Sequence, residues 1–489
     1  MSNNTTRPVK VRFAPSPTGT PHVGLIRTAL YNWAYAKAMG GTFLFRIEDT
    51  DIERDSEDSF DQIIEAMEWL GITTDEGVIA GGDHAPYRQS ERRHIYDEVL
   101  STLLAKGYLY ESFSNKDEID ARNLAAGRRI EQGYDNFDRN TTAEDAAAFR
   151  AEGRLPVYRM RMPDTDITFI DLVRGEITFP VVSATDYVVA RADGSPLYSF
   201  VNPVDDALMG VTHILRGEDL LSSTPRQLAL WHALVESGYA EALPTYAHLP
   251  FILAPNSNKK MSKRDPKSNL FNLRDEGYTS EGLLNYLALL GWGIAPDNDV
   301  FTMDEMVAAF DVADVSSSSS QFDEKKARAI NAEHIRRMDD GALIDYLIPL
   351  LAAEGLITDE ADDDTVEALL PVLKARIHLL PDAIDYMRPI LDKGFVTTSR
   401  PTSTVDYDNV MAALSLAAFT DDDAWDVDSL TAAYGALIEN DESLTNKTMW
   451  TPVRAALTNS KFSLPLFDIM AALGKKETIV RLTTYAVGA

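Results

Sequence analysis

The chain has 489 residues, a formal net charge of −30 and a hydrophobic content of 45%. This length exceeds that of one ordinary domain, so we expect several domains with enough apolar residues for their cores. The sequence has no cysteine, no apolar run of about 18 residues and no signal peptide, which excludes disulfides, thiolate metal sites and a transmembrane span; we therefore expect a cytoplasmic protein without a membrane partner.

The first predicted element is a strand that leads through a proline-rich loop into a helix. Residues 9–13 alternate apolar and other side chains with a period of two, as a strand does. Prolines and a glycine in residues 15–21 then break both strand and helix. Helical spacing begins at Gly24 and ends at Gly40-Gly41. Because His22 and Gly24 stand at a helix N-terminus, where free N–H groups favour anions, this unit is typical of a nucleotide-binding sheet.

A second strand and two helices are predicted to complete the first half of the sheet, residues 1–107. Thr42–Ile47 is rich in aromatic and branched residues and reads as the strand. It delivers Glu48-Asp49-Thr50-Asp51 to a carboxyl end, the edge where α/β sheets bind ligands. One helix is predicted from about Glu57 to Leu70, and another reaches about Lys106.

Residues 108–195 differ in character and suggest an inserted domain. A polar helix is predicted over Lys116–Gln132, followed by short strands around Val157–Arg161, Ile167–Leu172 and Glu176–Val182. Mixed elements between two α/β halves indicate an α+β insertion.

The second half of the sheet is predicted over residues 196–253, with a strand in Thr212–Asp219 and a helix that runs to about Glu236. A polar loop and a helical region follow over residues 254–330. Within it we expect the serine run Ser316–Ser320 to form a mobile surface loop.

The remainder of the chain is predicted to be entirely helical, in two parts over residues 331–398 and 399–489. We interpret the acidic clusters 362–364 and 421–423 as solvated faces. A net charge of −30 argues at first against a nucleic-acid partner, but net charge says little about how charge is distributed over a surface.

Two motifs carry a resemblance to a known family. Residues 259–264 hold four cations in six residues, a local reversal in an acidic chain. His22-Val23-Gly24-Leu25 resembles the HIGH motif, and Lys260-Met261-Ser262-Lys263-Arg264 the KMSKS motif, of class I aminoacyl-tRNA synthetases. The stretches Arg12–Gly19 and Phe45–Asp51 narrow the resemblance to the glutamyl and glutaminyl types. The helical C-terminal half resembles bacterial glutamyl-tRNA synthetases, whereas glutaminyl enzymes of the eukaryotic type end in β-barrels.

The resemblance implies an α/β fold with a Rossmann-type parallel-sheet catalytic domain and an inserted α+β domain that holds the tRNA acceptor end. Residues 254–330 would contact the tRNA stem, and the all-helical C-terminal domains would bind the anticodon. It implies ATP-dependent attachment of L-glutamate to the 3′ end of tRNA(Glu) through glutamyl-adenylate, with AMP and diphosphate released. We expect a monomer; whether tRNA(Gln) is also charged stays open. Some family members carry a cysteine-ligated zinc in the insertion, and for this cysteine-free chain we predict none.

Amino-acid activation gathers negative charge on phosphate oxygens, so positioning and electrostatics suffice and no covalent nucleophile is needed. The resemblance implies that His22 hydrogen-bonds the phosphates and that Gly24 lets the adenosine lie against the helix start. Lys260 and Lys263 would neutralise the triphosphate, which Mg²⁺ accompanies. The HIGH region comprises Pro15, Ser16, Pro17, Thr18, Gly19, Thr20, Pro21, His22, Val23, Gly24 and Leu25, and the KMSKS region comprises Lys260, Met261, Ser262, Lys263 and Arg264.

A substrate carboxylate needs a fixed cation, and arginine offers bidentate geometry that lysine cannot. By resemblance, the glutamate pocket is formed by Arg12, Ser16, Glu48, Tyr198, Asn202 and Arg216, with Glu48 on the ammonium. Asp205-Asp206 and Glu218-Asp219 are either supports of this pocket or helix-terminal charges. Arg376 and Arg454 resemble anticodon-reading positions.

Three alternative functions are considered. A glutamyl-queuosine-type tRNA modification enzyme shares the catalytic motifs but lacks the C-terminal anticodon-binding half. A nucleotidyltransferase with a His-x-Gly-His loop would need histidine where this chain has Leu25. A catalytically dead tRNA-binding protein is disfavoured by the intact His22, Lys260 and Lys263.

Overall fold

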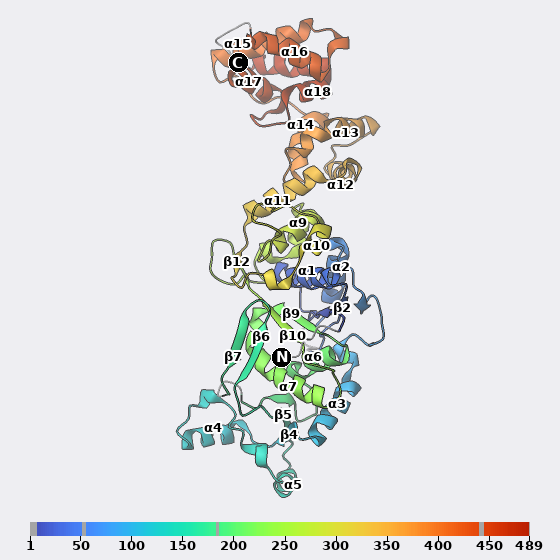
Figure 1. Ribbon diagram of the computed structural model, residues 1–489. Helices are drawn as coiled ribbons and strands as arrows, with labels where there is room; N and C mark the ends of the chain where they lie inside the picture. Colours follow the sequence, from blue (N-terminus) through green and yellow to red (C-terminus); the bar gives the residue numbers. More distant parts are fainter. Residues whose placement is uncertain (1–6, 51–54, 182–184, 440–444, 489) are drawn as a thin grey trace. The chain divides into compact units, whose positions relative to one another are not determined.

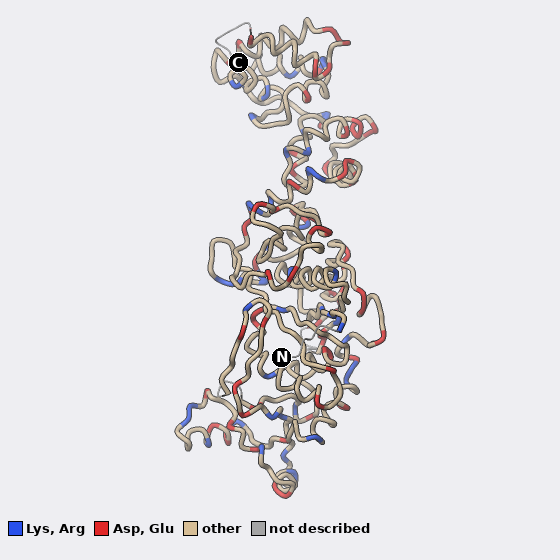
Figure 2. Tube along the Cα trace, viewed as in Figure 1, with Lys and Arg blue, Asp and Glu red and all other residues tan. Residues whose placement is uncertain are grey.

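The computed structural model describes residues 7–50, 55–181, 185–439 and 445–488 (Figure 1). Asp51 and Val182, which end two of the predicted segments, lie outside these ranges. The chain forms two compact units, one of Met1–Asn272 with Leu284–Glu324 and one of Leu273–Leu283 with Lys325–Ala489. Among the described residues, no helix is long and apolar enough to cross a membrane. Basic and acidic residues are interspersed along most of the trace (Figure 2).

The first unit is built around parallel strands whose order differs from their order in the chain. Strands β1 (Lys10–Phe13), β2 (Thr42–Phe45) and β3 (Glu76–Gly77) pair in parallel in the order β1-β2-β3. A second set has the order β7-β6-β10-β9, with β9 at His213–Gly217 and β10 at Thr245–Leu249. The two sets adjoin where the Lys10 amide donates to Thr212 Oγ1 at 2.8 Å and the Thr212 amide donates to the Lys10 carbonyl at 2.9 Å. The Rossmann-type core predicted from the sequence is therefore confirmed.

Helices pack on this sheet and bury its apolar side chains. They are α1 (Val23–Ala38), α2 (Glu57–Leu70), α3 (Arg93–Ala105), α6 (Tyr198–Leu208) and α7 (Thr224–Glu236). Helix α2 has the predicted bounds because both signals are local: Ser56 caps its N-terminus and Gly71 ends it at φ +67°. Trp231 and Phe200 are among the fully buried side chains of the core, and burial of each such side chain contributes roughly 1.5–3 kcal/mol.

The inserted region contains a separate antiparallel sheet of β4 (Leu109–Ser112), β5 (Val157–Met160) and β8 (Val188–Ala190). Helices α4 (Lys116–Ala125) and α5 (Ala143–Ala151) lie between β4 and β5 in the chain. The prediction of one helix to Gln132 is wrong, because Gly127 turns at φ +68° and only a short 3₁₀ turn follows at Ile130–Gln132.

Two further strands from the same sequence range extend the main sheet. They are β6 (Ile167–Asp171) and β7 (Gly175–Phe179), which form an antiparallel hairpin. β6 pairs in parallel with β10, where Asp171 lies opposite Tyr246. This pairing places the Asp171 carboxylate, from the predicted insertion 108–195, beside strand β10 of the main sheet.

The rest of the first unit holds short elements. They are β11 (Ile252–Leu253), α8 (Leu270–Asp275), α9 (Ser280–Ala288), α10 (Met303–Ala309) and β12 (Ser320–Gln321); α8 and α9 each continue into the second unit. Residues 316–319 of the serine run are exposed. The prediction of a mobile loop does not hold for the last serine, because Ser320 belongs to β12 and pairs with Ile252 of β11.

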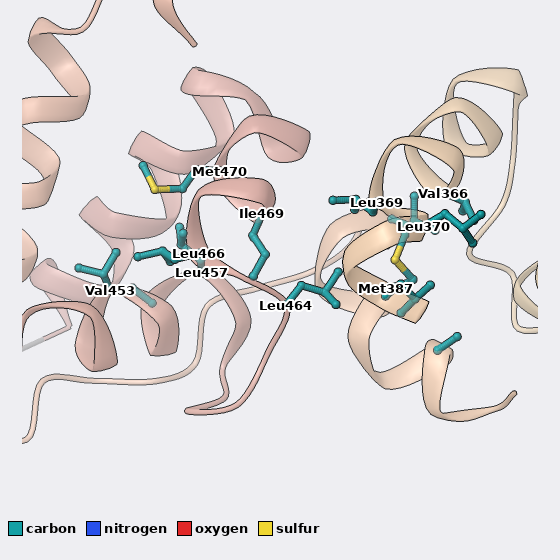
Figure 3. Close-up of a cluster of buried hydrophobic side chains, with 14 of the residues drawn as sticks. Val366, Leu369, Leu370, Met387, Val453, Leu457, Leu464, Leu466, Ile469 and Met470 are labelled. Carbon is teal, nitrogen blue, oxygen red and sulfur yellow. The ribbon is translucent and has the colours of Figure 1, made fainter. Parts of the chain in front are cut away.

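The second unit is all-helical over its described residues, as predicted. Its helices are α11 (Glu324–Arg337), α12 (Asp340–Ala353), α13 (Glu360–Lys374), α14 (Asp382–Leu391), α15 (Thr404–Phe419), α16 (Val427–Glu439), α17 (Asn446–Thr458) and α18 (Leu466–Val487). One apolar cluster joins side chains of α13 and α14 to those of α17 and α18, with Leu464 between the two groups (Figure 3).

One acidic cluster differs from its interpretation as a solvated face. Asp362 is only 7% exposed, and its carboxylate accepts hydrogen bonds from the Thr358 amide at 2.7 Å and hydroxyl at 2.8 Å. It therefore holds the turn before α13 in place. Residues 421–423 are exposed, as expected.

Candidate active site

A cavity of about 250 Å³ opens at the carboxyl ends of β1, β2 and β9. The predicted residues that line it are Arg12, Pro15, His22, Val23, Gly24, Leu25, Glu48, Tyr198, Asn202, Arg216, Lys260 and Met261. Residues separated by up to about 250 positions thus meet in one place, at the sheet edge where parallel α/β folds bind ligands.

His22 is the N-cap of α1, and its geometry fixes which ring nitrogen carries the proton. Nδ1 accepts a hydrogen bond from the Leu25 amide at 3.1 Å. Burial, followed by the positive charges of Lys263 and Lys260, lowers the pKa of His22 to about 4. The neutral ring therefore carries its proton on Nε2, where it is available to a ligand. Gly24 leaves room for the ring, because a Cβ there would lie 3.3 Å from Nδ1.

A buried network of charges lies beneath the cavity. Arg46 is fully buried and forms ion pairs with Glu48 at 3.1 Å and with Asp206 at 2.9 Å. Asp206 also accepts from Nε of Arg12 at 3.2 Å. Asn202 donates from its amide to the same Glu48 oxygen that Arg46 contacts. These bonds fix the Glu48 and Arg12 side chains at the cavity wall.

The network perturbs the acids in opposite directions. Burial raises the pKa of Glu48 more than Arg46 and Arg12 lower it. For Asp206, burial also raises the pKa, but Arg12 and Arg46 together outweigh it, so the net pKa lies below its usual range. Asp206 is therefore the firmly ionised member that compensates the two arginines.

Arg216 is held differently from Arg12. Its guanidinium donates to His248 Nε2 at 3.1 Å, to Thr224 Oγ1 at 2.9 Å and to the Gln227 amide oxygen. Among the described residues none of its hydrogen-bond partners is a carboxylate, and the residue is 3% exposed. A positive charge that faces a cavity with only neutral partners is suited to receive an anion.

The basic loop contributes unequally to the cavity. Lys260 lines it and pairs with Asp219 at 3.0 Å, which gives one of the two ambiguous acidic pairs a contact at the site. Met261 is buried, whereas Ser262, Lys263 and Arg264 are exposed and lie outside the cavity lining. Lys263 nevertheless lies close enough for its charge to act on His22.

Ser16 and several loop residues predicted with it lie elsewhere. Ser16 is exposed and is not part of the lining. The lining also leaves out Pro17, Thr18, Gly19, Thr20 and Pro21. Gly19 turns at φ +97°, and its amide donates to Ser59 Oγ at 2.8 Å. This bond ties the loop to the start of α2.

The residues that sequence reasoning missed are Arg46, Asp171 and His248. Arg46 stands inside the family-like stretch 45–51, so its place beside Glu48 offered a signal. Asp171 and His248 offered none, because their contact joins strands 77 positions apart.

The two predicted anticodon residues lie near each other in the second unit. Burial and the charge of Arg376 lower the pKa of Arg454. Arg376 is exposed and lines a cleft of about 630 Å³ together with Tyr386 and Phe462. Phe462 is 86% exposed. An arginine beside an exposed phenylalanine ring and a half-buried tyrosine is an arrangement that suits unpaired bases.

Comparison with known proteins agrees with the fold. Residues 8–329 match the family described as tRNA synthetases class I (E and Q), catalytic domain, and residues 342–486 match an anticodon binding domain. The fold and the site thus define a class I aminoacyl-tRNA synthetase; this family uses ATP, generally with Mg²⁺.

Similar proteins of known function specify the member of that class. A glutamate–tRNA ligase of Mycolicibacterium vanbaalenii is 53% identical over 97% of this chain and 96% of the relative, and one of Arthrobacter sp. is 50% identical over 98% and 96%. A crystal structure of a glutamate tRNA ligase from Elizabethkingia meningosepticum in complex with its amino acid is similar at a TM-score of 0.84 and 30% identity, covering 98% of this chain and 99% of that one. The chain belongs to the glutamate–tRNA ligase family.

Proposed function

We propose that the cavity binds ATP and L-glutamate side by side and forms glutamyl-adenylate, from which glutamate passes to the 3′ end of tRNA(Glu). The observation that carries this proposal is that the free Nε2–H of His22 and the guanidinium of Arg216 open into the same cavity. The first suits phosphate oxygens and the second suits a side-chain carboxylate. AMP and diphosphate are the other products.

On the phosphate side, the glutamate α-carboxylate attacks the α-phosphate of ATP and diphosphate leaves. Nε2 of His22 donates to phosphate oxygens as their charge grows, and Gly24 keeps the helix start accessible to the adenosine. Lys260, Lys263 and Arg264 neutralise the leaving diphosphate. Mg²⁺ enters with ATP as part of the substrate; within the described residues no group of three or more His, Asp or Glu converges to hold a metal.

On the glutamate side, Arg216 reads the γ-carboxylate. Arg12 is a weaker candidate for this role because Asp206 already compensates its charge. Within the described residues both contacts of the Glu48 carboxylate fall on Oε1, which leaves Oε2 to accept from the substrate ammonium. Tyr198 and Asn202 complete the wall, and Ser16 belongs to this set only if its loop moves inward.

The remaining segments bind tRNA. Residues 108–195 are proposed to hold the acceptor end without zinc, and residues 254–330 to contact the stem. Arg376 and Arg454 read the anticodon from the helical parts 331–398 and 399–489, where the cleft beside Phe462 supports this role. The match to an anticodon binding domain disfavours the modification enzyme, which lacks that half.

Charging of purified tRNA by the full chain tests the proposal. We expect ATP-dependent attachment of labelled glutamate to tRNA(Glu), with glutamine and aspartate inert. The same assay with tRNA(Gln) decides whether that tRNA is also a substrate. The expected monomer is tested by light scattering, which measures the molar mass of the protein in solution, and the expected cytoplasmic location by cell fractionation. Absence of charging of tRNA(Glu) by folded protein contradicts the proposal.

A further inference from the structure

Arg216 is fixed in direction by its neighbours on the adjacent strand. It lies on β9 directly opposite His248 of β10, and its guanidinium stands 5.1 Å from the ring centre of buried Tyr246. The bond from Arg216 Nε to His248 Nε2 lies in the buried wall, away from solvent. Nε2 of His248 is the acceptor for Nε of Arg216, while the two terminal nitrogens of the guanidinium donate to Gln227, Thr224 and the Leu220 carbonyl.

His248 can accept at Nε2 only in one tautomer. The ring is fully buried, and its Nδ1 lies 2.6 Å from Oδ2 of Asp171, which is also buried. Burial lowers the pKa of His248 more than Asp171 raises it, so the ring is neutral. A carboxylate only accepts, so the single ring proton sits on Nδ1 and the Nε2 lone pair faces Nε of Arg216 and the Thr224 hydroxyl, each 3.1 Å away.

We propose that Asp171 is a positioning residue for glutamate recognition: it selects the His248 tautomer that directs Arg216 at the substrate carboxylate. This inference rests on the proposed role of Arg216. Asp171 comes from the β6–β7 hairpin, so that hairpin, which extends the main sheet, also supports the amino-acid pocket.

The contacts of Asp171 make one substitution unusually informative. Oδ1 accepts from the amides of Val173 and Arg174, both at 3.0 Å, and the His248 amide donates to Oδ1 at 3.2 Å and to Oδ2 at 3.1 Å. In Asp171→Asn the amide oxygen must keep these turn bonds, so the amide nitrogen faces His248 Nδ1. Nδ1 then has to accept and the ring proton moves to Nε2. There it opposes the Nε–H of Arg216 and competes with that residue's guanidinium for Thr224 Oγ1, which lies 3.1 Å from Nε2.

The experiment measures KM and kcat for glutamate and for ATP in Asp171→Asn. We expect KM for glutamate to rise about 10- to 100-fold, as for loss of a hydrogen bond to a charged group, while KM for ATP stays within about twofold. Asp166→Asn is the matched control, because Asp166 lies one residue before the same strand and accepts only from the Val181 amide among the described residues. It should leave both KM values unchanged.

A second variant separates the tautomer from the fold. In His248→Gln the amide oxygen reaches the place of Nε2 and has no tautomer to lose, so glutamate KM should stay within about threefold of wild type. The double variant Asp171→Asn/His248→Gln should then bind glutamate better than Asp171→Asn alone. ¹⁵N spectra of labelled histidine should show the His248 proton on Nδ1 in wild type and on Nε2 in Asp171→Asn.

The outcomes distinguish two failures. If Arg216→Ala leaves glutamate KM unchanged, the proposed function of Arg216 is wrong. If Arg216→Ala weakens glutamate binding but folded Asp171→Asn does not, or if the double variant is no better than Asp171→Asn, the positioning role is wrong. Equal losses for glutamate and ATP would indicate a purely structural effect and would also overturn it.

Discussion

His22 combines two functions that two substitutions can separate. Its Nδ1 caps α1 through the Leu25 amide at 3.1 Å, and its Nε2–H faces the cavity. His22→Asn places an acceptor near Nδ1, preserves the cap and removes the donor. His22→Gln places an amide N–H near Nε2 and loses the cap. With a pKa of about 4, protonating the ring at pH 7 would cost about 4 kcal/mol, so the neutral ring is the donor.

The magnitudes follow from these contacts. Removing one donor to developing phosphate charge should cost about 2–4 kcal/mol, so His22→Asn should slow glutamyl-adenylate formation by on the order of 100-fold. His22→Gln should retain more of the rate but lose about 1 kcal/mol of stability with the cap. Single-turnover quench of labelled ATP and thermal unfolding measure the two effects. If His22→Asn forms adenylate as fast as His22→Gln, the donor role is refuted. Because the pKa of His22 is about 4, the wild-type rate of adenylate formation should show no titration of His22 between pH 6 and 8.

Three further predictions concern charges. Lys263→Ala should slow adenylate formation by on the order of 100-fold with little change in glutamate KM, and an unchanged single-turnover rate would contradict its phosphate role. Asp206→Asn should lower the free energy of unfolding by about 3–5 kcal/mol at pH 7, because it removes the one carboxylate that pairs with Arg12 among the described residues and one of the carboxylates that pair with buried Arg46. Since the pKa of Asp206 is lowered, that difference should persist above about pH 4 and shrink as the pH falls below it, which urea unfolding at pH 7 and pH 3 checks. Arg376→Ala should weaken tRNA(Glu) binding by about 1–3 kcal/mol without changing ATP affinity. The control is Arg388→Ala, which removes an arginine that pairs with Glu354 and should leave tRNA binding unchanged. Equal effects of the two variants in filter binding would contradict an anticodon role for Arg376.

Local signals predicted the fold well. The bounds of α2 were predictable because Ser56, which caps the helix, and Gly71, which ends it, directly flank the helix in the sequence. The helix predicted over Lys116–Gln132 is too long, because its polar pattern continues past Gly127 whereas the left-handed φ of Gly127 ends the helix. The pairing of β6 with β10 could not be predicted, because strand order depends on long-range contacts that no local pattern encodes.

The active site likewise has a part that the sequence predicts and a part that it does not. Arg12, His22, Glu48 and Arg216 were identified through motif resemblance, and the structure brings them to one cavity. What the sequence could not supply was the partner of each charge. Whether Arg12 or Arg216 is compensated by a carboxylate decides which of them can read a substrate anion, and that depends on buried pairs such as Arg12 with Asp206.

The most direct test of the account is amino-acid discrimination in Arg216→Ala. Glutamate- and glutamine-dependent ATP–diphosphate exchange, with tRNA(Glu) present, gives kcat/KM for both amino acids in wild type and variant. Loss of the guanidinium leaves the γ-carboxylate unpaired in a buried wall, which should cost about 2–5 kcal/mol for glutamate and little for glutamine. The preference for glutamate should therefore fall by at least on the order of 30-fold. A folded variant that discriminates as well as wild type would contradict the central claim that this cavity selects glutamate through Arg216.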